Sequence, residues 1–266
     1  MEDLSTCNIC IVTVCRNPGL SILDTAASIA AQTHALRWIV IDGISHDGTQ
    51  ERLRALPRPP DSLISEPDQG IADAFNKGLL AAGNHDVLFL NAGDALVGTT
   101  HLEQLARTWD RTAYPWIIGH ILVTTPVGSR LVKRGPPAAV APLRLVDRGN
   151  LIPHPAVLAP ASLLLEQGGF DITLKYAMDY DLWARLIVRG FTPQISDIVI
   201  TSFPLGGRSS NVSARVGEDM FVRRRNGVSA GFVAECWLNI GGVARLVAAP
   251  LRDSAWAYRL NRWIGW

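Results

Sequence analysis

The sequence predicts an α/β fold in which a mostly parallel central sheet is flanked by helices. Three short apolar runs, 9–14, 38–41 and 87–90, are rich in β-branched residues and have the composition of strands buried on both faces. Helical patterns lie between them, over 20–32, from the turn at 45–48 to about residue 56, and over 70–82. This alternation of strand and helix within about 90 residues is typical of a parallel, doubly wound unit.

Local residue types support each element in turn. Asn17-Pro18-Gly19 supplies turn residues after the first strand, and the polar segment 45–48 opens the second helix. In the third helix the apolar residues recur at helical spacing and form one face, which predicts that this face is buried. Later patterns predict helices over 101–109, 163–168 and 178–189, strands over 116–123 and 195–203, and an irregular segment over 135–142.

Composition excludes several classes of protein. The chain has 266 residues, 48% of them hydrophobic, and a formal net charge of +1, which excludes a disordered chain and gives no general reason to bind nucleic acid. The charge is uneven, because 208–266 holds nine Arg, no Lys and four acids. We therefore expect two parts, a main α/β domain over 1–210 and a basic helical tail, rich in Trp and Arg, over 211–266.

The N-terminal segment predicts a chain that stays in a reducing compartment. Cys7 and Cys10 have the spacing of half a zinc site, but no second pair completes it, so buried free thiols are the favoured interpretation. Acids at Glu2 and Asp3 and the lack of an apolar segment argue against a signal peptide. No uninterrupted apolar stretch is long enough to span a bilayer. We expect a cytoplasmic protein.

Polar residues follow three of the predicted strands: 13–17 after the first, Asp42 after the second and Asp94 after the third. Ligands of open parallel sheets bind beyond the carboxyl ends of the strands, so these residues predict a carboxylate-lined pocket. Such carboxylates can accept hydrogen bonds from a nucleoside or hold a hard divalent cation. The alternative is that each acid only closes an Asx turn. The Gly-rich dinucleotide motif, the P-loop and the Gly-x-Ser-x-Gly motif are all missing.

An ordered set of motifs over about residues 8–210 resembles family 2 glycosyltransferases with the GT-A fold. The resemblance lies in the stretches 11–17, 39–49, 66–78 and 88–94, followed by His154-Pro155-Ala156-Val157, Gly169-Phe170-Asp171, 178–186 and Gly206-Gly207-Arg208-Ser209. The tail after about residue 212 has no comparable motif. The resemblance implies transfer of a sugar from a nucleotide donor to an acceptor hydroxyl, with inversion at the anomeric carbon.

The resemblance also implies roles for individual residues. Asp94 would hold Mn²⁺ or Mg²⁺ as the last residue of a metal motif that here reads Asn91-Ala92-Gly93-Asp94, with one carboxylate instead of two. Gly43 likewise stands where a second Asp is frequent. The implied donor-binding residues are Asp42 for the base, Thr13 and Asn17 for the nucleoside pocket, Asp68 and Asp73 beside nucleotide and sugar, and Asn91.

On the acceptor side, Asp179 falls at the position of the family's catalytic base. The acceptor hydroxyl must lose a proton as it attacks, and a positioned carboxylate can take it. The alternative for Asp179 is an acid that only stabilises a helix N-terminus. His154 and Trp183 are implied on the acceptor side, with a structural histidine and a core tryptophan as their alternatives.

The basic tail predicts contact with a membrane surface. Arg252, Trp256, Arg259 and Trp263 share one face if the segment is helical, which suits a lipid headgroup region. Packing onto the catalytic domain or a dimer contact is the alternative.

Together these features predict a transferase of polysaccharide or glycolipid biosynthesis at the inner membrane face. It would use a UDP-, GDP- or dTDP-linked sugar and a saccharide or lipid-linked acceptor. A catalytically silent sugar-nucleotide-binding partner subunit and a nucleotidyltransferase are the alternatives.

Overall fold

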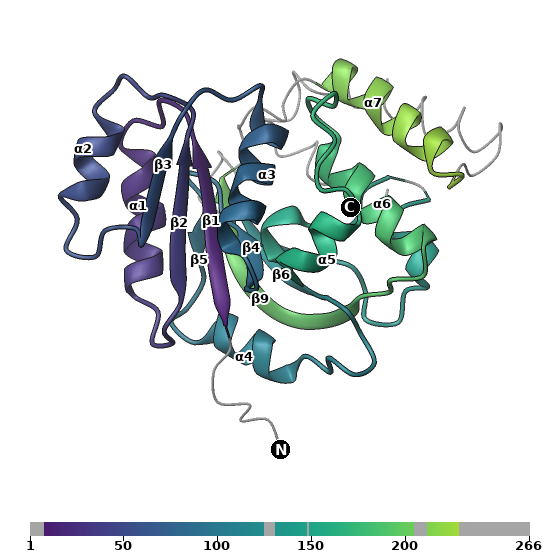
Figure 1. The fold of residues 1–266 in the computed structure, drawn as a ribbon. Coiled ribbons are helices and arrows are strands. Elements are labelled where there is room, and N and C mark those ends of the chain that lie inside the picture. Colours follow the sequence, from purple (N-terminus) through teal and green to yellow (C-terminus); the bar gives the residue numbers. More distant parts are fainter. Residues whose placement is uncertain (1–7, 125–130, 148, 205–211, 229–266) are drawn as a thin grey trace, which may run out of the picture.

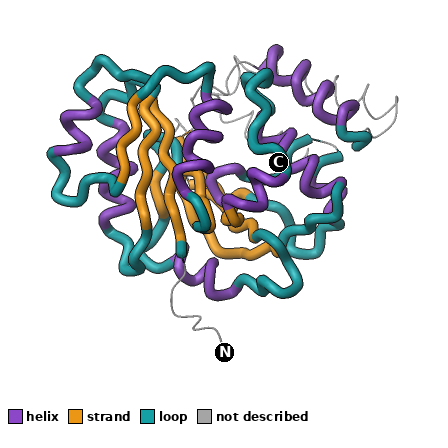
Figure 2. The backbone as a smooth tube through the Cα atoms, viewed as in Figure 1, coloured by secondary structure: helices purple, strands orange, loops and turns teal. Residues whose placement is uncertain are grey.

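A nine-stranded sheet forms the centre of the computed structural model, which describes residues 8–124, 131–147, 149–204 and 212–228 (Figures 1 and 2). Helices cover the sheet on both sides, as expected for an α/β fold. The elements are β1 (Ile9–Cys15), α1 (Ser21–Ala30), β2 (Arg37–Asp42), α2 (Thr49–Arg54), β3 (Ser62–Ser65), α3 (Ile71–Ala82), β4 (Asp86–Phe89), β5 (Ala95–Leu96), α4 (His101–Thr108), β6 (Ile117–Thr124), β7 (Leu131–Arg134), β8 (Val157–Pro160), α5 (Ala161–Glu166), α6 (Met178–Val188), β9 (Gln194–Pro204) and α7 (Val212–Arg225).

The strand order is β3-β2-β1-β4-β8-β6-β9-β5, with β7 paired to β6. The four strands from β3 to β4 are parallel to their neighbours, whereas β8 runs antiparallel to both β4 and β6. The predicted α/β fold is therefore confirmed. It is parallel throughout its first half and mixed in its second half, where the strands curl around the body (Figure 1).

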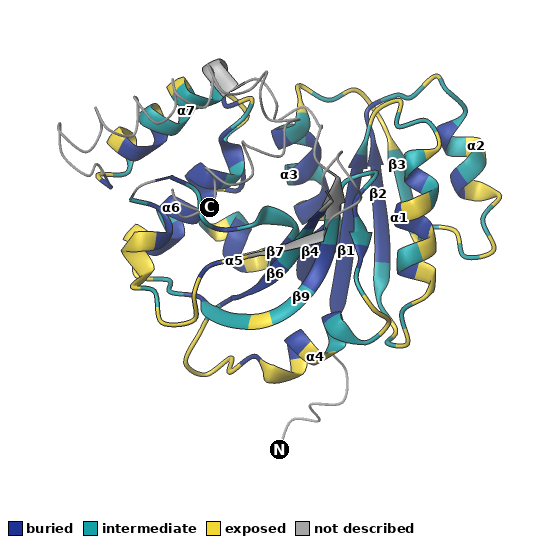
Figure 3. Cartoon of the chain, turned by 180° about the vertical axis from the view of Figure 1, so that it is seen from behind, coloured by how far each residue is buried: buried dark blue, intermediate teal, exposed yellow. Residues whose placement is uncertain are grey.

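Burial follows from composition in the parallel half. The side chains of β1 from Ile9 to Val14 and all four of β4 are buried, as the continuous apolar runs predict. Figure 3 shows these strands buried, and α1 with an exposed outer face. On the other side of β1, α3 approaches so closely that a Cβ at Gly78 would overlap the Val12 side chain. Gly78 therefore sets how near helix and strand can lie.

Four strands, β3, β5, β7 and β8, are not predicted by the sequence pattern. β3 is an edge strand with half-buried side chains, and β5 has only two residues, so neither carries a strong apolar signal. The helix expected over 163–168 begins two residues earlier, at Ala161, and ends at Glu166. Boundaries of this kind depend on packing more than on local composition.

The C-terminal helix α7 packs against α6 (Figure 1). The domain boundary expected at residue 210 falls in the segment 205–211, which lies outside the described residues, as do Gly206 to Ser209 of the resemblance. Most of the expected tail, 229–266, also lies outside them, together with Cys7. Cys10 and Cys15 are free thiols. In the described ranges, no helix combines the length and apolar character needed to cross a membrane.

Candidate functional site

The carboxyl ends of the parallel strands meet at one edge of the sheet (Figure 1). Cys15 at the end of β1 is in register with Asp42 on β2, which is in register with Ser65 on β3. On the other side of β1 lies β4. The Leu90 amide just after β4 donates to the Val12 carbonyl at 3.0 Å, so the segment 91–94 that follows lies beside the end of β1. The predicted gathering of strand-end residues at one edge is therefore present, and it is where open α/β sheets bind ligands.

Asp42 anchors the turn that follows β2. Its carboxylate accepts hydrogen bonds from the backbone amide of Ser45 at 3.1 Å, from the hydroxyl of Ser65 at 2.7 Å and from the amide of Gln50 at 3.3 Å. The residue has no exposed surface. A direct contact between Asp42 and a nucleobase, which the resemblance implies, is not available in this arrangement. The carboxylate instead fixes the turn beside the strand ends.

The loops after β1 and β2 are joined by hydrogen bonds. The backbone amide of Asn17 donates to the Ser45 hydroxyl at 2.7 Å, and the side-chain oxygen of Asn17 accepts from the backbone amide of His46 at 2.8 Å. The Gly19 amide donates to Asp47 at 2.7 Å. Asn17 has a positive φ of 49°, a conformation that asparagine tolerates better than most residues. Asn17 is exposed, so it stands at the edge where a nucleoside would lie.

Thr13 does not face this edge. Its side chain is fully buried, and its hydroxyl accepts a hydrogen bond from the indole of Trp38 at 3.1 Å. The expectation that the Thr13 side chain lines the nucleoside pocket is therefore corrected, because the side chain belongs to the core between β1 and β2. Strand periodicity explains the difference, since neighbouring residues point to opposite faces of the sheet.

Asp68 and Asp73 lie on the loop before α3 and on its first turn. One Asp68 oxygen accepts from the Gly70 amide at 3.0 Å, and the other lies where a Cβ at Gly43 would stand. Asp68 therefore packs across the glycine that replaces the family's frequent second carboxylate. Asp73 accepts from the Gln69 amide at 3.0 Å and lies 3.5 Å from the Lys77 ammonium.

Asn91 and Asp94 form the best candidate for a cation site. Asp94 is 5% exposed, and burial raises the pKa of its carboxyl group to about 7. One Asp94 oxygen and the Asn91 side-chain oxygen are buried and have no hydrogen-bond partner among the described residues. Thr25 holds the turn, because its hydroxyl donates to the Asp94 carbonyl at 2.7 Å and accepts from the Gly93 amide at 2.9 Å.

Two buried, unsatisfied oxygens on one turn fit a hard divalent ion, which prefers oxygen ligands. Within the part of the chain that the structure describes, no group of three or more acidic, His or Cys side chains gathers as a complete metal site. The protein would therefore supply only part of a coordination shell, and the remainder would come from ligand phosphates or water.

Asp179 is the second residue of α6 and is half-buried. Its carboxylate accepts a hydrogen bond from the side-chain amide of Asn150 at 3.1 Å. The side-chain oxygen of Asn150 accepts from the backbone amide of Ile152 at 3.1 Å, and this second bond orients the Asn150 side chain. The Asp179 charge also acts on His154, where it opposes the lowering of the pKa by burial. Asp179 therefore lies close to His154, which stacks on Phe89 of β4 with ring centroids 5.2 Å apart.

His154 and Trp183 pack against other aromatic rings. His154 is half-buried as a residue, but both of its ring nitrogens are buried and have no partner among the described residues, and burial of the ring lowers its pKa. Trp183 has no exposed surface and stacks on Trp116 at 5.4 Å. The expected acceptor contact of Trp183 is corrected, because its side chain has no exposed surface. The acceptor-side role of His154 stays a prediction, since the residue is half-buried. Aromatic rings from distant segments pack against both side chains.

Two acids that the sequence interpretation missed lie beside Asp179. Glu218 and Asp219 are consecutive residues of α7, and the Asp179 charge contributes to a raised pKa of about 6 at Asp219, where burial is the main cause. Asn150 was also not predicted. No local motif marks these residues, and only the packing of α7 and of the 142–156 region onto α6 brings them to Asp179.

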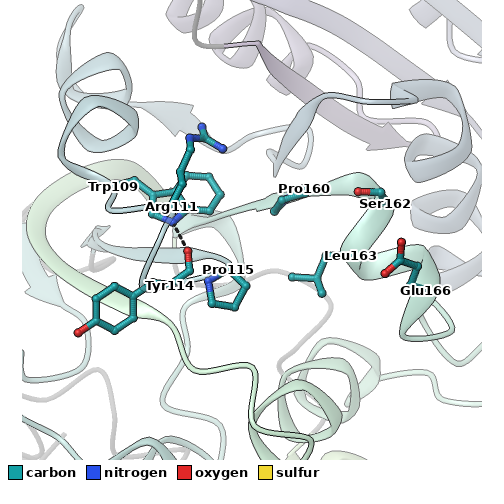
Figure 4. A pocket seen from close by; sticks show the side chains of 8 residues that line it. All are labelled: Trp109, Arg111, Tyr114, Pro115, Pro160, Ser162, Leu163 and Glu166. Atoms are coloured by element: carbon teal, nitrogen blue, oxygen red, sulfur yellow. Dashed lines mark hydrogen bonds between the residues drawn. The ribbon is translucent and has the colours of Figure 1, made fainter. Parts of the chain in front are cut away.

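A shallow cavity of about 230 Å³ lies elsewhere, between the loop after α4 and the start of α5 (Figure 4). Arg111 stacks over Trp109 at 3.9 Å and forms an ion pair with Asp86 at 2.6 Å. Because Asp86 is the first residue of β4, this cavity is at the amino-end edge of the parallel strands. It is remote from the strand-end turns, and its Arg is already paired.

Comparisons with known proteins agree with this geometry. The sequence model described as Glycosyl transferase family 2 matches residues 10–149, more than half of the chain. A search of curated proteins found no match. S. aureus TarS 1–349 in complex with UDP-GlcNAc has a TM-score of 0.66 at 18% identity, covering 87% of this chain and 69% of that one. The full S. aureus TarS structure has a TM-score of 0.63 at 17% identity, covering 92% and 43%.

A mannosyltransferase, PcManGT from Pyrobaculum calidifontis in complex with GDP-Man and Mn²⁺, has a TM-score of 0.57 at 15% identity, covering 94% of this chain and 88% of that one. At these identities the likeness shows a shared fold. The family itself rests on the match over 10–149.

Proposed function

Because the chain belongs to glycosyl transferase family 2, we propose that it moves a sugar from a nucleoside diphosphate donor to an acceptor hydroxyl, with inversion at the anomeric carbon. The observation that carries the proposal is the pair of buried oxygens of Asn91 and Asp94, which have no hydrogen-bond partner in the described ranges and lie at the edge where the parallel strands end. A second supporting observation is the half-buried carboxylate of Asp179, whose charge acts on His154, a residue that stacks on Phe89 of β4. In this proposal Asn91 and Asp94 bind the diphosphate end of the donor, and Asp179 takes the proton of the acceptor hydroxyl.

Asp179 is the proposed general base. The acceptor oxygen attacks the anomeric carbon, its proton passes to the Asp179 carboxylate, and the bond from that carbon to the phosphate oxygen breaks. The nucleoside diphosphate leaves with the bonding electrons. Attack on the face opposite the leaving group gives inversion. The hydrogen bond from Asn150 holds the carboxylate in place for this step.

Asp94 and Asn91 are the proposed ligands of Mn²⁺ or Mg²⁺. Such an ion, when bound, neutralises the negative charge that develops on the departing diphosphate. The raised pKa of Asp94 supports the role, because a buried carboxylate without a partner gains more from a nearby cation than an exposed one. GDP-Man and Mn²⁺ in the PcManGT complex support the same class of donor and metal.

Asn17, Asp68 and Asp73 are the proposed donor-binding side chains. All three are at least partly exposed and lie on loops or helix turns at the strand-end edge, between the joined loops after β1 and β2 and the start of α3. The donor class is a UDP-, GDP- or dTDP-linked sugar, for which the UDP-GlcNAc and GDP-Man complexes of similar folds offer support. We further propose a saccharide or lipid-linked acceptor in polysaccharide biosynthesis, approached through a tail at the membrane surface.

A second candidate is a catalytically silent subunit that only binds nucleotide sugar. The single carboxylate of the Asn91–Asp94 turn favours it, together with the lack of a complete cluster of metal ligands in the described ranges.

One experiment separates the two candidates. The protein is titrated by calorimetry with UDP-GlcNAc, GDP-mannose and a dTDP-sugar in Mn²⁺, and nucleoside diphosphate release is then followed for each donor that binds. Transfer predicts binding and slow release to water, and Asp179→Asn removes the release while donor affinity persists. Binding without any release supports the silent subunit, and the failure of all three donors to bind contradicts both candidates.

A further inference from the structure

Helix α7 lies outside the region matched by the family model, and polar contacts join its C-terminal end to α6 and to the loop before α6. The Asn226 side chain, just after α7, donates to Asp181 of α6 at 3.1 Å, and Arg225 pairs with Asp171 on the loop before α6. Val222 is the buried apolar residue of the described face of α7. A helix attached in this way has a defined orientation, because hydrogen bonds and ion pairs depend on direction more than apolar contacts do.

The most densely bonded group of α7 is the Glu218 carboxylate. It accepts hydrogen bonds from three consecutive backbone amides: Lys175 at 3.0 and 3.1 Å to its two oxygens, Tyr176 at 2.7 Å and Ala177 at 2.9 Å. Ala177 is the N-cap of α6, and its methyl side chain cannot cap the helix. Glu218 therefore satisfies amides at and before the helix start that would otherwise need water or a capping side chain.

Asp179 follows this capped segment directly. It is separated from Ala177 by one residue, so the orientation of the 175–177 backbone determines where its carboxylate points. The other fixed contact of that carboxylate to a different segment is the hydrogen bond from Asn150 at 3.1 Å. Asp219, adjacent to Glu218 in sequence, lies near enough for the Asp179 charge to act on it, which places this part of α7 beside the base.

We propose that Glu218 is a positioning residue for Asp179: by binding the amides of 175–177 it holds the first turn of α6, and with it the carboxylate, in the orientation that accepts the acceptor's proton. This inference rests on the proposed function. It makes α7 part of the catalytic apparatus, although α7 follows the residues in which family motifs are found. A carboxylate suits the place because charge-assisted hydrogen bonds to three amides are stronger than those of a neutral cap.

The test compares Glu218→Ala, Glu218→Gln and Arg225→Ala in the full chain. Diphosphate release is measured with whichever of UDP-GlcNAc, GDP-mannose and the dTDP-sugar the wild-type protein turns over in Mn²⁺. For Glu218→Ala we expect kcat to fall by about 10- to 100-fold, because misplacing a reacting group by about 1 Å costs this much. The donor KM should stay within about twofold, since Glu218 contacts no proposed donor-binding residue. Glu218→Gln, which keeps one acceptor oxygen, should recover part of the loss.

Arg225→Ala is the matched control. It removes an ion pair between α7 and the same loop but leaves the amides of 175–177 bonded to Glu218. We expect it to lower the unfolding temperature about as much as Glu218→Ala while kcat changes by less than about twofold. Hydrogen exchange at 175–181 should quicken in Glu218→Ala well beyond its rate in Arg225→Ala.

A folded Glu218→Ala protein with wild-type kcat overturns the proposal. Equal loss of kcat in Glu218→Ala and Arg225→Ala also overturns it, because general loosening of α7 would then explain both. If the wild-type protein releases no diphosphate from any of the three donors, the proposed function fails and this role fails with it.

Discussion

Replacing Asp94 by Asn should stabilise the protein above neutral pH. Asp94 is 5% exposed, and one of its oxygens has no partner in the described part of the chain. Burial raises the pKa of the carboxyl group from an ordinary 3.8 to about 7. Each pKa unit corresponds to about 1.4 kcal/mol, so keeping this group ionised in the folded state costs roughly 4 kcal/mol.

The sign follows from proton binding. Between about pH 4 and about pH 7 the unfolded chain has lost the Asp94 proton while the folded chain retains it, so the free energy of unfolding falls as pH rises through this window. Below it Asp94 contributes no difference, and above it the full cost applies. Asn cannot ionise, so Asp94→Asn should gain up to about 4 kcal/mol over the wild type at pH 8 and nothing at pH 4.

The assay is urea unfolding of both proteins in EDTA at several pH values between about 4 and about 8. Asp110→Asn provides a control of opposite sign. Hydrogen bonds from the Thr112 side chain and backbone lower the pKa of Asp110, so its stabilising effect is present above the ordinary pKa and is lost on acidification. Parallel stability curves for the wild type and Asp94→Asn would refute the reasoning about the buried carboxylate.

Three further substitutions test the site and its support. Asp179→Asn should lower diphosphate release by about 10²- to 10⁴-fold with donor affinity by calorimetry within about twofold; wild-type turnover would remove the proposed base. Gly43→Ala should displace the Asp68 carboxylate and weaken donor affinity at an unchanged unfolding midpoint; unchanged affinity argues against Asp68 as a donor ligand. Gly78→Ala should cost about 1 kcal/mol in urea unfolding, because overlap with Val12 outweighs the gain in helix propensity; equal or higher stability contradicts that packing.

The sequence was sufficient to predict three of the four strands of the parallel half, together with their carboxyl ends. β1, β2 and β4 are continuous apolar runs, and α3 has a clear apolar face, so local composition determines these elements. The turn residues that follow them, such as Asn17 and Asp94, were predicted at the same edge because parallel strands end there together. That prediction needs no knowledge of side-chain packing.

Side-chain direction and long-range partners were not accessible in the same way. Thr13 is a polar residue near a strand end, and only its hydrogen bond to Trp38 on the adjacent strand shows that its side chain belongs to the core. His154 looks like a polar loop residue, yet Phe75 and Phe89 from distant segments enclose it. Glu218 reaches amides 41 to 43 residues away in sequence. Only the assembled fold reveals contacts of this kind.

The central claim is that Asp94 and Asp179 act on the two ends of one bond in a bound nucleotide sugar. A crystal structure with UDP-GlcNAc or GDP-mannose and Mn²⁺, recorded at a wavelength where manganese scatters anomalously, tests this most directly. We expect an anomalous peak beside Asp94 and Asn91, and the anomeric carbon on the side that faces the Asp179 carboxylate. Donor and metal bound elsewhere, or an anomeric carbon turned away from Asp179, would contradict the account.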